Sequence, residues 1–127
     1  MELVAIVAAI ALLEYMVFVW LAGKARGEAG VPAPAMSGDP DFERHVRVQE
    51  NTVEQLVIFL PALFLFALYA SELGAAVLGG VFIVGRGLYA HAYVRDPAKR
   101  GPGFALTLVA NIVLVVGTIV GAVSRLF

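Results

Sequence analysis

Apolar residues are concentrated in four long runs along the chain, separated by shorter polar segments. The runs cover residues 3–22, 53–70, 73–94 and 104–123. Each is close to the roughly 20 residues that a helix needs to cross a bilayer. Because lipid offers no hydrogen-bond partners, the backbone groups of such runs must pair internally, which favours helices. The pattern therefore predicts an all-α integral membrane protein, a bundle of four transmembrane helices.

The connections between these runs carry the residues that begin and end helices. The segment Asp39-Pro40-Asp41 suits the start of the second helix, which we expect to include polar residues and to span 44–70. Residues 24–41 form the first loop, residues 71–74 a short turn, and residues 95–103 a third connection rich in Pro and Gly. The sequence predicts one domain over residues 1–127, with spans near 3–22, 44–70, 73–94 and 104–123.

Basic residues are distributed unevenly among these connections. Seven of the nine lie in or beside the first and third loops: Lys24, Arg26, Arg44, Arg47, Arg95, Lys99 and Arg100. Cytoplasmic loops of membrane proteins carry an excess of Lys and Arg. We therefore expect the first and third loops in the cytoplasm and both termini on the opposite side.

Composition narrows the class of protein further. Hydrophobic residues make up 61% of the chain and charged residues 15%, which is too apolar for an ordinary soluble domain. The net charge of −1 suggests no nucleic-acid partner. The chain has no cysteine, which excludes disulfides, thiolate catalysis by the protein and cysteine metal sites. Two histidines are too few to indicate a metal site.

The first candidate site is a set of polar residues at the start of the second helix. Arg44, Arg47, Asn51 and Glu54 are spaced 3, 4 and 3 residues apart, so they share one helix face. Guanidinium groups bind carboxylates, Asn both donates and accepts, and Glu receives an ammonium. The set suits a zwitterionic, peptide-like ligand with terminal carboxylates. The alternative is an internal salt-bridge network that stabilises the bundle.

The third helix carries a second set, Arg86, Tyr89 and Tyr93, again on one face. A charged residue inside a membrane must face a partner or a polar cavity. Glu14 lies at a similar depth in the first helix, so we expect Arg86 to be neutralised by Glu14, Glu54 or both. The tyrosines have an alternative role as interfacial residues.

Arg95, Lys99 and Arg100 follow in the third connection. Their charges are explained by membrane topology alone. The alternative is that an arginine here holds or polarises a reactive group at the mouth of the site.

Two segments of the chain resemble a known family. FERHVRVQENTVEQLVIFLP, residues 42–61, resembles the second-helix signature of the MAPEG family, the membrane-associated proteins of eicosanoid and glutathione metabolism. GRGLYAHAYVRDPAKRGPG, residues 85–103, resembles that family's third helix and following loop, especially in the microsomal glutathione transferase 3 branch. The resemblance covers nearly the whole chain, including its length and four-span layout.

The resemblance implies a homotrimer that binds glutathione as co-substrate between neighbouring subunits, toward the cytosolic side. It implies that Arg47, Asn51 and Glu54 line the glutathione site from one subunit. It also implies that Arg86, Tyr89 and Tyr93 approach from the neighbour or support the site. In the leukotriene-C synthase branch, an arginine seven residues after the second tyrosine is proposed to activate the thiol. Arg100 has that spacing, and Lys99 is a possible substitute.

The activity that the resemblance implies is a transferase or peroxidase reaction of lipophilic electrophiles with an activated glutathione thiolate. A nearby Arg or Tyr donor would stabilise that thiolate. Gln55 occupies a position where the leukotriene-C synthase branch has a tyrosine, which weakens the transfer of a specific eicosanoid substrate.

Two other functions fit the same pattern of residues. A small proton-coupled multidrug exporter would use Glu14 as its proton and substrate site and would have little need for Arg47 or Asn51. A non-catalytic member of the same fold would bind only lipid or a partner protein.

Overall fold

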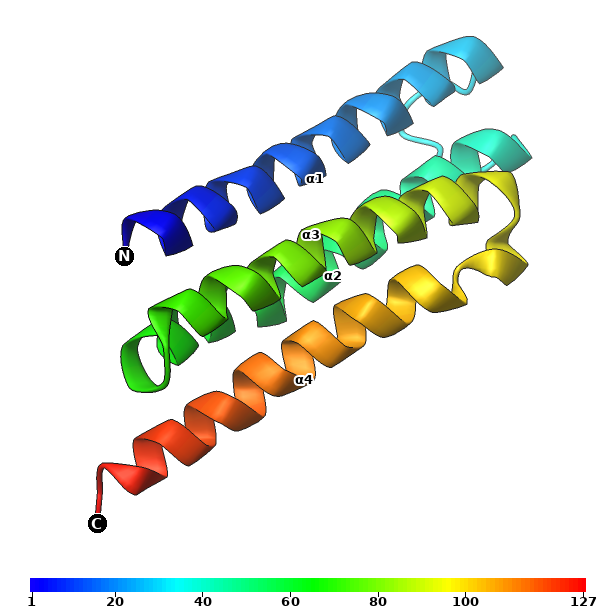
Figure 1. The fold of residues 1–127 in the computed structure, drawn as a ribbon. Coiled ribbons are helices and arrows are strands. Elements are labelled where there is room, and N and C mark those ends of the chain that lie inside the picture. The colour runs from blue at the N-terminus through cyan, green and yellow to red at the C-terminus, as the bar shows by residue number, and fades with distance from the viewer.

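The computed structural model describes residues 1–127 as four long helices that lie side by side (Figure 1). They are α1, Glu2–Ala29; α2, Pro40–Tyr69; α3, Glu72–Arg95; and α4, Gly101–Ser124. A short 3₁₀ helix, η1, covers Pro97–Lys99 between α3 and α4. All four long helices are long and apolar enough to cross a membrane. The predicted all-α fold with four spans is confirmed.

The helices α2 and α3 form the centre of the bundle, with α1 on one side and α4 on the other (Figure 1). Both termini and the turn between α2 and α3 lie at one end, while the α1–α2 connection and η1 lie at the other. The two connections rich in basic residues therefore share one end of the molecule. That this end faces the cytoplasm stays a prediction.

Side-chain caps explain where the central helices begin. The carboxylate of Asp39 accepts a hydrogen bond of 3.0 Å from the backbone N–H of Phe42, and Pro40 occupies the first helical position. The hydroxyl oxygen of Ser71 accepts one of 2.9 Å from the N–H of Gly74. Such caps satisfy N–H groups that have no partner within the helix.

All four helices are longer than the sequence predicted, α3 by only one residue at each end. The largest difference is at α1, which continues to Ala29 through residues that were expected in the first loop. Ala25 in this extension is buried in a cluster with Phe42 and Val46 of α2, a contact that apolar run length does not reveal. The helix ends at Gly30, whose φ of 70° favours glycine. The helix α2 begins at Pro40 rather than 44, and α4 at Gly101 rather than 104.

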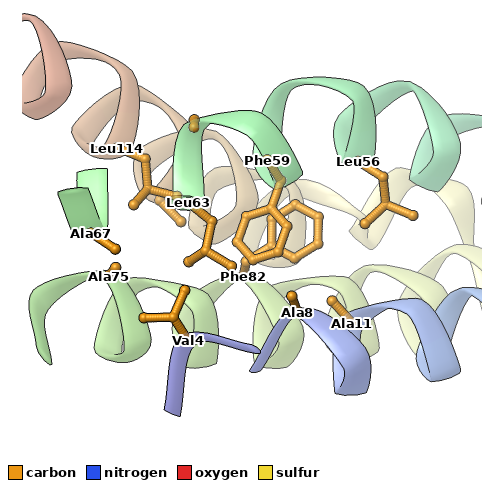
Figure 2. Packing of buried hydrophobic residues seen from close by; sticks show 12 residues of the cluster. Val4, Ala8, Ala11, Leu56, Phe59, Leu63, Ala67, Ala75, Phe82 and Leu114 are labelled. Carbon is orange, nitrogen blue, oxygen red and sulfur yellow. The ribbon is translucent and has the colours of Figure 1, made fainter. Parts of the chain in front are cut away.

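One hydrophobic cluster joins all four helices (Figure 2). At its centre the rings of Phe59 from α2 and Phe82 from α3 stack with their centroids 3.9 Å apart. Ala8 and Ala11 bring α1 close to this pair, and Leu114 contributes from α4. Because small residues allow close backbone approach, α1 packs tightly despite its few large buried side chains.

The helices α3 and α4 approach most closely beside the third connection. A Cβ atom at Gly103 would clash with the backbone nitrogen and Cα of Tyr89. A Cβ atom at Gly85 would lie 2.9 Å from the Cβ of Leu106. These glycines fix the start of α4, and therefore Arg100, beside the tyrosines of α3.

Candidate functional site

Arg86 is completely buried and connects α3 to the polar face of α2. Its Nη2 donates to the side-chain oxygen of Asn51 at 2.8 Å and to the hydroxyl oxygen of Thr52 at 2.9 Å. The Thr52 hydroxyl in turn donates to the backbone oxygen of Val48 at 2.7 Å. This network holds Asn51, which is itself buried, in a fixed orientation on α2.

The two tyrosines of the third helix lie next to this arginine. The guanidinium carbon of Arg86 is 4.3 Å from the ring centroid of Tyr89, within the range of cation–π attraction. The Tyr89 ring is buried and stacks on Tyr93 with centroids 5.5 Å apart. Phe104 of α4 lies 6.4 Å from Tyr89, centroid to centroid. The structure therefore brings Arg86, Tyr89 and Tyr93 together, as their spacing predicted.

The expected ion pair between Arg86 and an acidic residue is not formed. Glu54 instead accepts a hydrogen bond of 3.1 Å from Nη1 of Arg47. Glu14 forms no salt bridge, and its Oε1 is a buried atom without a hydrogen-bond partner. Neutral polar side chains on the facing helix bind the arginine, because α2 turns Asn51 and Thr52 toward α3 while Glu54 stays at the surface.

Arg47 and Glu54 form a half-exposed polar surface on α2. The Arg47 side chain is 43% exposed and that of Glu54 is 58% exposed. Glu50 lies at 3.6 Å from the same guanidinium nitrogen. Exposed ion pairs contribute little to stability, about 0–1 kcal/mol. These groups are consequently free to exchange partners with a charged ligand.

Arg44 was expected on the same ligand-binding face, but its side chain bonds to the end of α3. Its Nη1 donates to the backbone oxygens of Val94 and Arg95, each at 3.2 Å. These carbonyls belong to the last turn of α3 and have no partner within that helix. Arg44 therefore caps α3 from a neighbouring helix.

Arg100 and Lys99 lie exposed where η1 passes into α4. Nη1 of Arg100 donates to the backbone oxygen of Pro97 at 2.8 Å. Arg100 also lines an open cavity of about 390 Å³ together with Ala98, Gly101 and Phe104. Because Phe104 packs on Tyr89, this cavity adjoins the tyrosines of α3.

Sequence reasoning missed two polar contacts inside the bundle. Thr52 received no role, although it is the second acceptor for Arg86. The side-chain nitrogen of Asn111 in α4 donates to the side-chain oxygen of Gln55 in α2 at 3.0 Å. Both are neutral polar residues within apolar runs, a signal that could have predicted interhelical hydrogen bonds.

The chain is similar to several known proteins. The model of the MAPEG family matches residues 4–120. The bovine microsomal glutathione S-transferase 2 is 40% identical over 109 residues, which cover 86% of this chain and 73% of that protein. An uncharacterized protein of Synechocystis is 46% identical over 122 residues, 96% of this chain and 89% of its own length. The bovine leukotriene C4 synthase is 34% identical over 76 residues, which cover 60% of this chain and 51% of that protein.

Two of these relatives are named for an activity, a type 2 microsomal glutathione transferase and a leukotriene C4 synthase. They do not single out the microsomal glutathione transferase 3 branch, which stays a prediction. The match over residues 4–120 includes α2 and α3 in full and most of α1 and α4 of this multi-pass membrane protein. The chain belongs to the MAPEG family.

Proposed function

We propose that this protein is a membrane-embedded glutathione-dependent transferase that acts on lipophilic electrophiles. The observation that carries the proposal is the Arg86–Asn51 hydrogen bond, which fixes an amide beside the charged pair Arg47 and Glu54. The names of the relatives support glutathione as the co-substrate. Glutathione has two carboxylates, an ammonium and a thiol, so a site for it needs both signs of charge.

The half-exposed pair on α2 fits the ends of such a ligand. In the proposed complex a carboxylate of glutathione replaces Glu54 at the guanidinium of Arg47, and its ammonium pairs with Glu54. Because the present ion pair is exposed, breaking it costs only about 0–1 kcal/mol. Asn51 contributes its side-chain N–H groups, since its oxygen already accepts from Arg86.

Arg86 is completely buried, and Tyr89 is 2% exposed, with its ring between Arg86 and Tyr93. We assign them to support of the site: Arg86 orients Asn51, and Tyr89 holds the ring of Tyr93. Tyr93 is only partly buried and remains available for ligand contact.

Arg100 is the proposed thiol-activating residue. Only one of its N–H groups is used, in the bond to Pro97, so the others can donate to a sulfur anion. The thiolate attacks the electrophilic carbon, a C–S bond forms, and the leaving group departs with its electron pair. Lys99 is the substitute, because it is exposed in the same turn.

The same glutathione thiolate could also carry out a peroxidase reaction, which we include in the proposal. The thiolate would attack the terminal oxygen of a lipid hydroperoxide and release the lipid alcohol after protonation. A second glutathione would then convert the sulfenic acid into the disulfide and release water. The electrophile or hydroperoxide would enter from the bilayer, because large apolar side chains cover the outside of the bundle.

We also propose that the protein acts as a homotrimer. Glu54 and Arg100 are exposed and Arg47 is half-exposed on the isolated chain, so a neighbouring copy can complete the enclosure of the ligand. Native mass spectrometry of the detergent-solubilised protein should show three chains, and a monomer with full activity would contradict this assembly.

The proposed function is tested by conjugation of glutathione to chlorodinitrobenzene by the purified protein. Arg47→Ala should raise KM for glutathione, and Arg100→Ala should lower kcat. Lys24→Ala is the matched control, because Lys24 is an exposed cation at the same end of the bundle that contacts Glu28 and the Trp20 ring and none of the candidate site residues. Glutathione binding without turnover would favour a non-catalytic member of the fold, and absence of binding would contradict the proposal.

A further inference from the structure

A pocket of about 300 Å³ lies between α1, α2 and α3 within one chain. Two histidines, His45 and His91, line this pocket. The other lining residues are apolar and include Phe18, Leu21, Val48 and Gly87. The volume is at the lower end of the range for small-molecule sites. Arg47, Asn51, Glu54 and Arg100 do not line this pocket, so it is separate from the candidate glutathione site.

Glu14 does not itself line this pocket but lies next to Gly87, which does. Its Oε2 is 3.5 Å from the position that a Cβ atom would occupy at Gly87, and Gly87 lines the pocket. Glu14 is also one helical turn before Phe18, another lining residue, so the two share a face of α1. Because Gly87 has no side chain, nothing from that residue separates the carboxylate from the pocket.

The Glu14 carboxylate has no hydrogen-bond partner and no salt bridge, and its Oε1 is a buried atom. A carboxylate at membrane depth is costly unless a donor satisfies it. Arg86 does not donate to it: its Nη2 bonds to Asn51 and Thr52, and its Nε and Nη1 are buried without a hydrogen-bond partner. The group missing at this position is a hydrogen-bond donor.

From this geometry we infer that the pocket binds a small lipophilic amine, whose ammonium donates to Glu14 while its hydrocarbon part contacts Phe18, Leu21 and Val48. The ligand supplies the N–H donors that Glu14 lacks. A lipophilic acid is disfavoured, because its carboxylate would face Glu14. The inference does not depend on the glutathione reaction.

Octylamine is a suitable probe, with octanol and octanoate as chain-matched comparisons. Isothermal titration calorimetry with the protein in lipid nanodiscs, corrected with empty nanodiscs, should show saturable binding of octylamine. Glu14→Gln should weaken that binding by about tenfold or more, the loss expected for one charge-assisted hydrogen bond. Octanol should bind more weakly than octylamine to the unchanged protein, and octanoate should not bind.

Two further variants separate loss of the ligand site from loss of the fold. Gly87→Leu keeps the carboxylate and fills the pocket, and its Cβ meets nothing closer than Glu14 Oε2 at 3.5 Å. It should abolish octylamine binding. Glu28→Gln removes an exposed carboxylate from the same helix and should leave binding unchanged. The inference would be overturned if Glu14→Gln or Gly87→Leu bound octylamine as tightly as the unchanged protein does. Absence of saturable binding to the unchanged protein would also overturn it.

Discussion

Arg86 is a buried cation whose hydrogen bonds all go to neutral groups, through Nη2 alone, while its Nε and Nη1 have no partner. Its charge is bound by Asn51 and Thr52 and lies over the Tyr89 ring. The sequence predicted that Arg86 needs a partner, because a charge at that depth is costly when unpaired. It did not identify the partner, since the rotation of α2 against α3 decides which polar side chains face inward.

At the residue scale, Arg86→Ala should destabilise the protein by about 1.5–3 kcal/mol, the range for hydrogen bonds to a charged group. The measurement is the unfolding transition in detergent. Arg125→Ala is the control, because Arg125 is exposed and makes one bond to the Leu68 oxygen. Its effect should stay within about 0.5 kcal/mol. Equal losses in the two variants would contradict the structural role given to Arg86.

The helices themselves were the most predictable part of the molecule, and their ends were less so. The four apolar runs and the cap at Asp39 are local signals, and all appear in the structure. The extension of α1 to Ala29 depends on burial of Ala25 against α2, which is a tertiary contact. Likewise, Arg44 was assigned to a ligand face, but the end of α3 lies within its reach.

A first prediction at the element scale concerns this cap. Arg44→Ala should leave the carbonyls of Val94 and Arg95 without their side-chain donor and loosen the last turn of α3. Hydrogen exchange of the amides in residues 94–100 should become faster. Glu43→Ala changes a neighbouring exposed residue and should have no such effect. Unchanged exchange in Arg44→Ala would show that the cap is dispensable.

A second prediction concerns the close approach of α3 and α4. Gly103→Ala places a methyl group against the backbone of Tyr89 and should cost about 1–3 kcal/mol, as overpacking does. Gly101→Ala is a matched control, because a Cβ atom there meets nothing within 4 Å. Thermal unfolding should separate the two variants clearly. If both unfold at the same temperature, the helices do not approach as closely as described.

At the scale of the whole molecule, the basic loops lie together at one end of the bundle (Figure 1). The positive-inside rule predicts that this end faces the cytoplasm. A chain without cysteine allows a clean test with single exposed cysteines. In sealed vesicles, an impermeant maleimide should label Ala98→Cys from the cytoplasmic side and Leu126→Cys from the other. The reverse labelling would show the opposite orientation, with the candidate site on the side of the membrane away from the cytoplasm.

The candidate glutathione site also belongs to this scale, because its groups come from α2, α3 and the turn before α4. Sequence spacing predicted which residues share a helix face, and family resemblance implied their ligand. Neither could predict that Arg47 and Glu54 pair with each other in the isolated chain, because that contact depends on side-chain orientation at an exposed surface.

The most direct test of the account is titration of glutathione onto the purified protein, followed by the ultraviolet absorbance of the bound thiolate. We expect a saturable signal, a higher midpoint for Arg47→Ala, a smaller amplitude for Arg100→Ala, and no change for Lys24→Ala. A folded protein that gives no saturable thiolate signal would contradict the proposed glutathione-activating site.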